Sequence, residues 1–407
     1  MEPTLSRRTA LAALATTALL PATALSPATA SARDRVRLRL PAPSGPYAVG
    51  TTSTHLVDRS RADPYVTDQP YRELMATVTY PARGGGPPAP WLTPGWVEHA
   101  ETVMQGLMGD LPPGLVDWAG ARSYSRFDAH PLPGPVVLVT LGHWFSLGAV
   151  RTVMEDLASH GYVVVATDPT YETPVRFPDR LVPVHDAALP PPGAEVTSPA
   201  FFAYVRTIYR SRVADARFAL DALGAAPGLP EPLRRSLRTG PVGVVGGGTG
   251  AGLAALQLAH DDPRVAAAAV GDSAVGWPTP DGTAPITTVV EDGLDGPVLA
   301  VLPGAVDRDP LWDRQWTGLR GWRRELEVRE GGHAWLTDLQ TVLPQVVRGL
   351  DLPTDHFAPA LGTADPASVL AARRTYLRAF FDLHLRGRDH HLLDAPSPRH
   401  RVVRFVR

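Results

Sequence analysis

Short apolar runs that alternate with helical segments limit the possible folds of this chain more than any other feature of its sequence. The predicted strands lie at residues 136–140, 163–167, 242–245, 265–270, 298–302 and 326–329, and the predicted helices at 147–160, 200–223, 250–260 and 366–385. Strands that are apolar throughout are typical of a parallel sheet covered on both faces. The sequence therefore predicts an α/β fold with a mostly parallel central sheet and helices on both faces.

The chain before this region predicts a different start to the sheet. Residues 47–57 and 72–80 have the pattern of an antiparallel strand pair. No internal repeat or Gly/Ser linker divides the sequence that follows. We therefore expect residues 33–407 to form one domain.

Residues 83–135 form an excursion between the two regions. They are rich in Gly, Pro and Trp, and the pattern predicts one short helix at 103–108. The tryptophans of this excursion, Trp91, Trp96 and Trp118, are expected either to roof a pocket as a lid or to cover the sheet.

The composition excludes several classes of partner and cofactor. With 39 Lys and Arg against 41 Asp and Glu, the chain lacks the basic excess that binding to nucleic acid or anionic lipid requires. It contains no cysteine, which excludes disulfides, thiolate metal sites and a cysteine nucleophile. The histidines, including His390 and His391, lack metal-ligand spacing and are expected to be solvated. We expect a small-molecule ligand, with no metal and no other cofactor; the sequence leaves the oligomeric state open.

The N-terminal residues have the pattern of a twin-arginine export signal. Arg7 and Arg8 precede an apolar run over residues 10–25, and small residues up to Ala32 offer a cleavage site. Pro21 interrupts the run, which is shorter than the roughly 20 apolar residues that a spanning helix needs. The first 32 residues are therefore predicted to be removed, without a stable membrane anchor, and the mature protein is expected to act outside the cytoplasm.

The predicted helix at 200–223 carries an apolar stripe at three- and four-residue spacing. Arg206, Arg210, Arg212 and Arg217 lie beside this stripe. We expect these arginines to form a solvated face.

A glycine-rich turn at residues 241–253 follows a predicted buried strand and opens a helix, and it supports two interpretations. Gly246, Gly248 and Ala251 approximate the G-x-G-x-x-G/A dinucleotide fingerprint, with Asp272 near the expected distance. That fingerprint normally occupies the first βα unit of its domain, whereas this turn follows at least two such units. In the second interpretation, the turn occupies the place of the G-x-S-x-G nucleophile elbow.

The flanking motifs favour the second interpretation. The chain resembles the platelet-activating-factor acetylhydrolase-like lipases and esterases of the α/β-hydrolase superfamily over nearly its whole mature length. The segments that carry the resemblance are residues 40–50, 55–58, 72–81, 135–138, 157–168, 262–265, 331–338 and 379–387. Their order and spacing imply the α/β-hydrolase fold, and we expect a small apolar or ester-like substrate.

The elbow departs from these relatives, which usually carry Gly-His-Ser-x-Gly-Gly. Counted from the strand, Gly248 takes the place of the nucleophile; counted back from Asp262, Thr249 does. An elbow residue has a positive φ that glycine adopts freely and a β-branched residue resists. We therefore expect Gly248 at the nucleophile position and Thr249 as the N-cap of the following helix.

The resemblance assigns the other catalytic positions. His333, in Gly-Gly-His-Ala-Trp, matches the general base, and Asp272 matches the acid that orients it. Asp307 and Asp309 are alternative acids, and Ser273 is a candidate displaced nucleophile.

The corner after the predicted strand 136–140 also differs from the relatives. Leu141-Gly142-His143-Trp144-Phe145 replaces their His-Gly-Phe-type residues. Backbone donors of His143 and Thr249 are expected to form an oxyanion hole, and Trp144 is expected near the pocket. The imidazole of His143 is expected either near the pocket or packed on the surface.

Covalent acyl transfer needs an attacking oxygen, and removing it from a triad costs about 10⁶ in turnover. Three hypotheses follow. The His333–Asp272 pair performs non-covalent acid/base chemistry: cyclisation, elimination, isomerisation or attack by water. Alternatively, the protein is a catalytically silent ligand binder, or Thr249 or Ser273 rescues hydrolysis.

Overall fold

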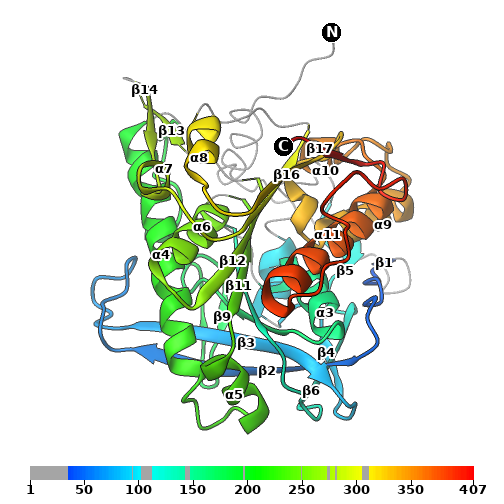
Figure 1. Ribbon diagram of the computed structural model, residues 1–407. Helices are drawn as coiled ribbons and strands as arrows, with labels where there is room; N and C mark the ends of the chain where they lie inside the picture. The colour runs from blue at the N-terminus through cyan, green and yellow to red at the C-terminus, as the bar shows by residue number, and fades with distance from the viewer. Residues whose placement is uncertain are drawn as a thin grey trace.

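The computed structural model describes residues 35–93, 95–101, 112–142, 147–195, 198–248, 250–272, 276–279, 282–304 and 311–407. Its strands are β1 (Val36–Arg37), β2 (Ala48–Asp58), β3 (Arg72–Ala82), β4 (Pro88–Pro90), β5 (Val116–Asp117), β6 (Arg122–Phe127), β7 (Val136–Thr140), β8 (Val163–Thr167), β9 (Val175–Arg176), β10 (Leu181–Val182), β11 (Val242–Gly246), β12 (Val265–Val270), β13 (Gly276–Thr279), β14 (Gly282–Pro285), β15 (Val298–Pro303), β16 (Arg323–Val328) and β17 (Val403–Phe405). Its α-helices are α3 (Arg151–Ser159), α4 (Pro199–Leu223), α5 (Glu231–Thr239), α6 (Ala251–Asp261), α7 (Val289–Asp292), α8 (Trp312–Gly318), α9 (Leu339–Gly349), α10 (Ala358–Leu361) and α11 (Pro366–Arg386). Figure 1 shows these elements around one large twisted sheet.

Within the described residues the main sheet has the strand order β17-β16-β15-β12-β11-β7-β8-β3-β2-β6-β4. The strands from β16 to β8 are all parallel, and β3 pairs antiparallel with both β8 and β2. This confirms the predicted mostly parallel sheet and the antiparallel strand pair. The excursion after β3 adds β6 and β4 at one edge, which the sequence pattern did not predict.

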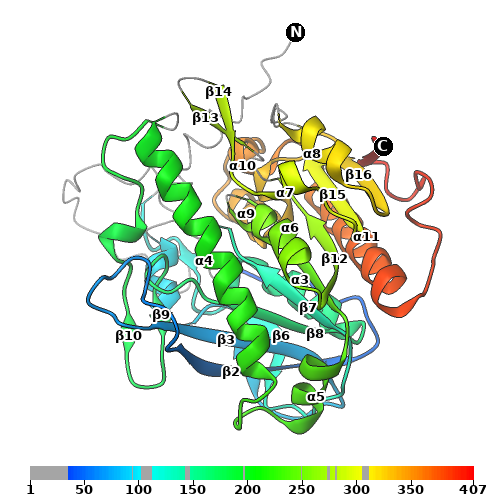
Figure 2. The ribbon, with the colours of Figure 1, turned by 60° about the vertical axis from the view of Figure 1, so that its left-hand side comes forward.

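Helices cover both faces of the sheet, as predicted. One apolar cluster contains buried residues of α4 and α6, and a second contains those of α3 and α11. Figure 2 shows α4 crossing the front of the sheet, with α11 to the right of β12. The sheet is therefore buried from both sides, which is why its central strands are apolar throughout.

The tryptophans of the excursion belong to a third apolar cluster. Trp91, Trp96 and Trp118 are buried there with α9 residues such as Leu339 and Leu343. Their rings therefore cover the side of the domain next to α9. In the part of the chain that the structure describes, no helix is long and apolar enough to cross a membrane.

One expectation for α4 was wrong. Arg206, Arg210 and Arg217 are exposed as predicted, but Arg212 is buried. Its guanidinium makes a bidentate pair with Glu172, with both N···O distances 2.7 Å. The acid lies 40 residues away in sequence, so the local helical pattern carries no sign of it.

A second buried ion network joins α4 to β3. Asp215 accepts hydrogen bonds from Arg72, at 3.0 Å from Nη2, and from Arg61. Arg72 is fully buried and also donates to Asp63 at 2.7 Å. Burial by itself raises the pKa of Asp215, but the arginines outweigh it and hold that pKa below its usual value of 3.8. The charged form of Asp215 therefore stabilises the fold.

We expect Asp215→Asn to lower the free energy of unfolding by about 3–5 kcal/mol at pH 7, because it leaves buried arginine charge without its partner. Asp221→Asn is the matched control on α4, since Asp221 forms an exposed pair with Arg264 and should cost at most about 1 kcal/mol. The Asp215 contribution is fully present above its unfolded pKa, near 3.8, and is lost as pH falls through the lower folded value. Urea unfolding should therefore show the deficit of Asp215→Asn shrinking below pH 3.8; a deficit that grows there would contradict this assignment.

Candidate active site

The glycine-rich turn joins the central strand β11 to α6. Gly248 has φ +83° and Gly250 has φ +77°, so both adopt the left-handed conformation that favours glycine. The N–H of Gly248 donates to the carbonyl of Asp272 at 2.7 Å, and the N–H of Gly271 donates to that of Gly246 at 2.7 Å. These bonds tie the turn to the end of β12.

Asp272 and His333 come together at the carboxyl ends of β12 and β16. Oδ2 of Asp272 lies 2.6 Å from Nδ1 of His333, and their side chains are 5% and 13% exposed. A carboxylate at Nδ1 places the proton there and leaves Nε2 of the neutral ring as an acceptor. The imidazole is thus arranged to remove a proton.

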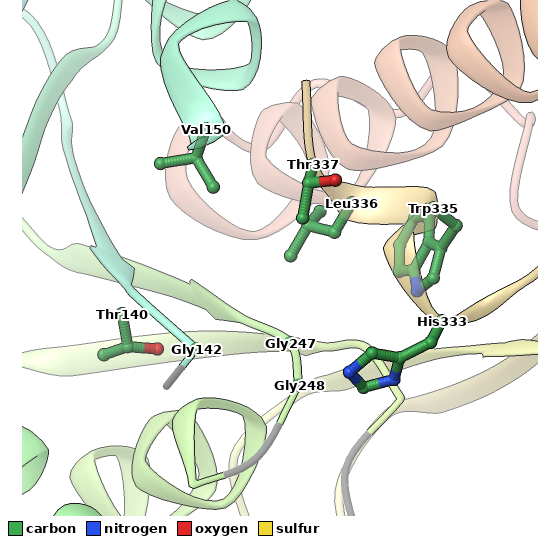
Figure 3. A pocket seen from close by; sticks show the side chains of 9 residues that line it. All are labelled: Thr140, Gly142, Val150, Gly247, Gly248, His333, Trp335, Leu336 and Thr337. Carbon is green, nitrogen blue, oxygen red and sulfur yellow. The ribbon is translucent and has the colours of Figure 1, made fainter. Parts of the chain in front are cut away.

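Gly248 lies directly opposite this imidazole (Figure 3). A Cβ on Gly248 would stand 3.6 Å from Nε2 of His333 and 3.8 Å from Cα of Gly142, which are ordinary contacts. A hydroxyl on such a Cβ would lie within reach of Nε2. The structure therefore brings together Gly248, Asp272 and His333.

A hollow lies over the turn, with about 380 Å³ of empty space, part of it open to solvent. It is lined by Thr140, Gly142, Val150, Gly247, Gly248, His333, Trp335, Leu336 and Thr337. Apart from Gly248 and His333, these residues were not predicted to line a site. Trp335, Leu336 and Thr337 lie in the same motif as His333, so the motif itself was the available signal. The described tryptophans of the excursion do not line this hollow.

Several candidate residues lie outside the described part of the chain. They are His143, Trp144, Thr249, Ser273, Asp307 and Asp309. The expected oxyanion donors, the rescue nucleophiles and the alternative acids therefore stay predictions. The dinucleotide interpretation needs Asp272 for a ribose hydroxyl, whereas here its carboxylate contacts His333.

Asp338 fixes the loop that carries His333, and sequence reasoning did not single it out. It is fully buried and accepts from the N–H of Thr152 at 3.1 Å and from Nε1 of Trp91 at 3.1 Å. Its own N–H donates to the carbonyl of Ala149 at 2.7 Å. Burial raises the pKa of Asp338, against the opposing effect of Arg373. This network joins the His333 loop to the start of α3 and to the excursion.

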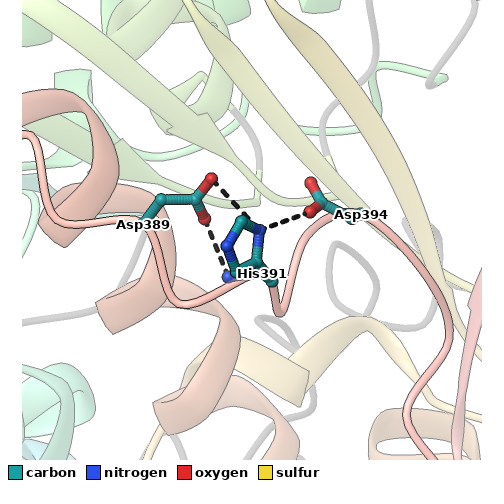
Figure 4. A group of neighbouring side chains, drawn as sticks. All are labelled: Asp389, His391 and Asp394. Carbon is teal, nitrogen blue, oxygen red and sulfur yellow. Dashed lines mark hydrogen bonds and ion pairs between the residues drawn. The ribbon is translucent and has the colours of Figure 1, made fainter.

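Among the described residues, Asp389, His391 and Asp394 form the one group of three acidic or imidazole side chains close enough to share an ion (Figure 4). All three are exposed, and His391 Nδ1 lies 2.9 Å from Asp394. His390 is also exposed, and it contacts Asp382 at 3.0 Å. Asp389, His390, His391 and Asp394 lie on the loop after α11, whereas Asp382 is a buried residue of α11. None of these residues lines the hollow.

Comparison with known proteins gives matches among solved structures. No protein-family model matches the chain, and no curated protein matches it. Among solved structures, a ferulic acid esterase from Streptomyces cinnamoneus is similar, with 32% sequence identity and a TM-score of 0.69. The similarity covers 91% of this chain and 99% of that one.

Two alanine substitutions test the geometry of the turn. We expect Gly248→Ala to cost about 1–2 kcal/mol, the strain of a left-handed φ, because its Cβ meets only ordinary contacts. Gly246→Ala should cost about 3 kcal/mol or more, since its Cβ would overlap Oγ1 of Thr140 and the carbonyl of Ala251. Thermal unfolding of both variants provides the comparison, and a larger loss for Gly248→Ala would contradict this arrangement.

Proposed function

Because the chain belongs to the α/β-hydrolase-fold esterases, we propose that it hydrolyses a small ester by direct attack of water, without an acyl-enzyme intermediate. The single observation that carries the proposal is the 3.6 Å between Nε2 of His333 and the Cβ that Gly248 lacks. The sequence has glycine where a serine hydroxyl would stand, so a water molecule is the attacking group available to the imidazole. The sequence motifs favour the platelet-activating-factor acetylhydrolase-like branch of the family, and we include that branch in the proposal.

The chemistry assigned to each residue follows from its position. Nε2 of His333 removes a proton from water while the water oxygen forms a bond to the ester carbonyl carbon. Asp272, hydrogen-bonded to Nδ1, stabilises the imidazolium that forms. The tetrahedral anion then collapses, the ester C–O bond breaks, and the imidazolium returns its proton to the departing alkoxide.

The lining of the hollow supports a compact, largely apolar substrate. Val150, Trp335 and Leu336 present apolar side chains, and Thr140 and Thr337 add hydroxyl groups. The similar structure is a ferulic acid esterase. Methyl ferulate and p-nitrophenyl acetate are therefore suitable probes for this chain.

We expect the purified protein to hydrolyse one of these esters, and His333→Ala to lower kcat by about 10²–10⁴ with little change in ligand affinity. A fluorophosphonate probe should leave the wild type unlabelled, because position 248, opposite Nε2, carries no hydroxyl. Labelling at Thr249 or Ser273 would contradict direct water attack, because it would show that this residue serves as a covalent nucleophile. Ester binding with no turnover in either protein would leave ligand binding as the function.

Gly248→Ser serves as the positive control for the site. The serine hydroxyl would stand within reach of His333 Nε2, so the variant should react with fluorophosphonate at residue 248. Gly248→Ala separates the effect of the hydroxyl from that of added bulk. Labelling of Gly248→Ser that survives His333→Ala would contradict the role of His333 as base.

We also propose that the protein acts outside the cytoplasm. The twin arginine at Arg7 and Arg8, ahead of an apolar run, supports export by the twin-arginine route. We expect replacement of both arginines by lysine to leave the full-length chain in the cytoplasm, as measured by fractionation and immunoblotting. Unchanged export of the double variant would exclude this route.

A further inference from the structure

The buried pair of Arg212 and Glu172 lies beneath the corner that follows β7. The steps of the proposed hydrolysis assign this pair no role. Nε of Arg212 donates to the carbonyl of Leu141 at 2.8 Å, while its two Nη atoms contact Glu172 at 2.7 Å each. Tyr65 donates its hydroxyl to the same carboxylate at 2.7 Å. All three side chains are 5% exposed or less.

These contacts fix the guanidinium in a single orientation. Both Nη atoms are held by one carboxylate, so Nε points in the direction that the planar fork dictates. Burial by itself lowers the pKa of Arg212, but Glu172 outweighs it and raises that pKa above its usual value. Burial and the Glu172 charge also raise the pKa of Tyr65, so its hydroxyl stays a donor. A buried charge pair of this kind is weak evidence for stability alone.

The fixed carbonyl of Leu141 also determines where the N–H of Gly142 points, because both belong to one peptide unit. A trans peptide is planar, so the N–H of Gly142 points away from the carbonyl of Leu141. Arg212 belongs to α4, which packs on one face of the sheet, whereas Val150, Trp335 and Leu336 of the hollow belong to the apolar cluster on the other face or border it. Holding the carbonyl on the α4 side therefore turns the N–H toward the hollow.

Gly142 is suitably located to use this N–H. It lines the hollow, and its Cα would lie 3.8 Å from a Cβ on Gly248. Within the described residues, its N–H donates to no acceptor, although the residue is buried. A buried N–H without a partner is uncommon unless a ligand or solvent molecule occupies the space in front of it.

We propose that Arg212 is a positioning residue: through the Leu141 carbonyl, it aims the Gly142 N–H at the negative oxygen that develops on the substrate. This rests on the proposed ester hydrolysis, because water attack creates that oxygen. Donors fixed in advance stabilise such an oxygen more than they stabilise the neutral ester. The Arg212 pair therefore acts on the transition state while leaving the binding of the neutral substrate nearly unchanged.

The test compares two ligands on variants of this pair. A methyl arylphosphonate monoanion mimics the tetrahedral anion, and the corresponding neutral aryl methyl ketone mimics the ground state. We expect Arg212→Lys to weaken phosphonate binding about tenfold or more and ketone binding less than about twofold. Arg217→Lys, an exposed substitution on the same helix, should change neither.

A double variant keeps the test valid if Arg212→Lys does not fold. Arg212→Met with Glu172→Gln removes both charges, so it leaves neither buried and unpaired. We expect it to show the same selective loss of phosphonate affinity. Equal losses for the two ligands would overturn the proposal, because a merely structural role affects both.

An NMR measurement gives a readout that does not depend on turnover. Labelling with 1-¹³C-leucine and ¹⁵N-glycine selects the four Leu–Gly peptide bonds of the chain, and Gly142→Ala identifies the Gly142 signal by its loss. We expect the phosphonate to shift that amide downfield in the wild type and not in the double variant. No shift in the wild type, or no phosphonate binding at all, would overturn the proposal. Absence of ester turnover with the shift intact would instead overturn the proposed hydrolysis alone.

Discussion

The hydrogen bond between Asp272 and His333 is the interaction on which the site depends. It joins the ends of β12 and β16, residues 61 positions apart in sequence, and it exists because parallel strands present their carboxyl ends at one edge of the sheet. The turn at Gly248 reaches the same edge from β11, and its N–H bonds to the carbonyl of Asp272. One residue thus orients the imidazole through its side chain and holds the turn through its backbone. The distance between Gly248 and Nε2 is therefore fixed by the sheet.

The sequence predicted the parts of the fold that depend on local pattern. Continuous apolar runs identified β7, β8, β11, β12 and β15 because both faces of these strands are buried. The strand β6 was not predicted because its inward side chains are Ser123 and Ser125, small polar residues that give no apolar alternation. The burial of Arg212 was not predicted for a related reason. A helical stripe shows which residues adjoin the core, but it does not show where a distant acid will lie. Interactions between remote segments decide both cases.

The candidate site shows the same division. Asp272 and His333 were identified from motifs, whereas spacing alone would not have paired them. Asp338 lies in the same motif as His333, yet its buried contacts with Thr152 and Trp91 depend on how α3 and the excursion pack. The motif therefore marks the chemistry, while the tertiary structure decides which neighbouring residues hold it in place.

The bend at Gly248 does not depend on which side chain stands at its tip. Gly246 packs so closely on Thr140 and on the Ala251 carbonyl that the chain must turn at once from β11 into α6, whatever side chain follows. Glycine at position 248 then relieves the strain of a left-handed φ that a serine would bear. Under the proposed water attack, a water molecule takes the place of a fixed serine oxygen and is immobilised at a cost of up to about 2 kcal/mol. One acyl transfer to water then replaces the acylation and deacylation of covalent catalysis. In the proposed mechanism His333 acts as base on a water molecule instead of a tethered hydroxyl, so the rate depends on how firmly the surrounding backbone holds that water and the developing anion.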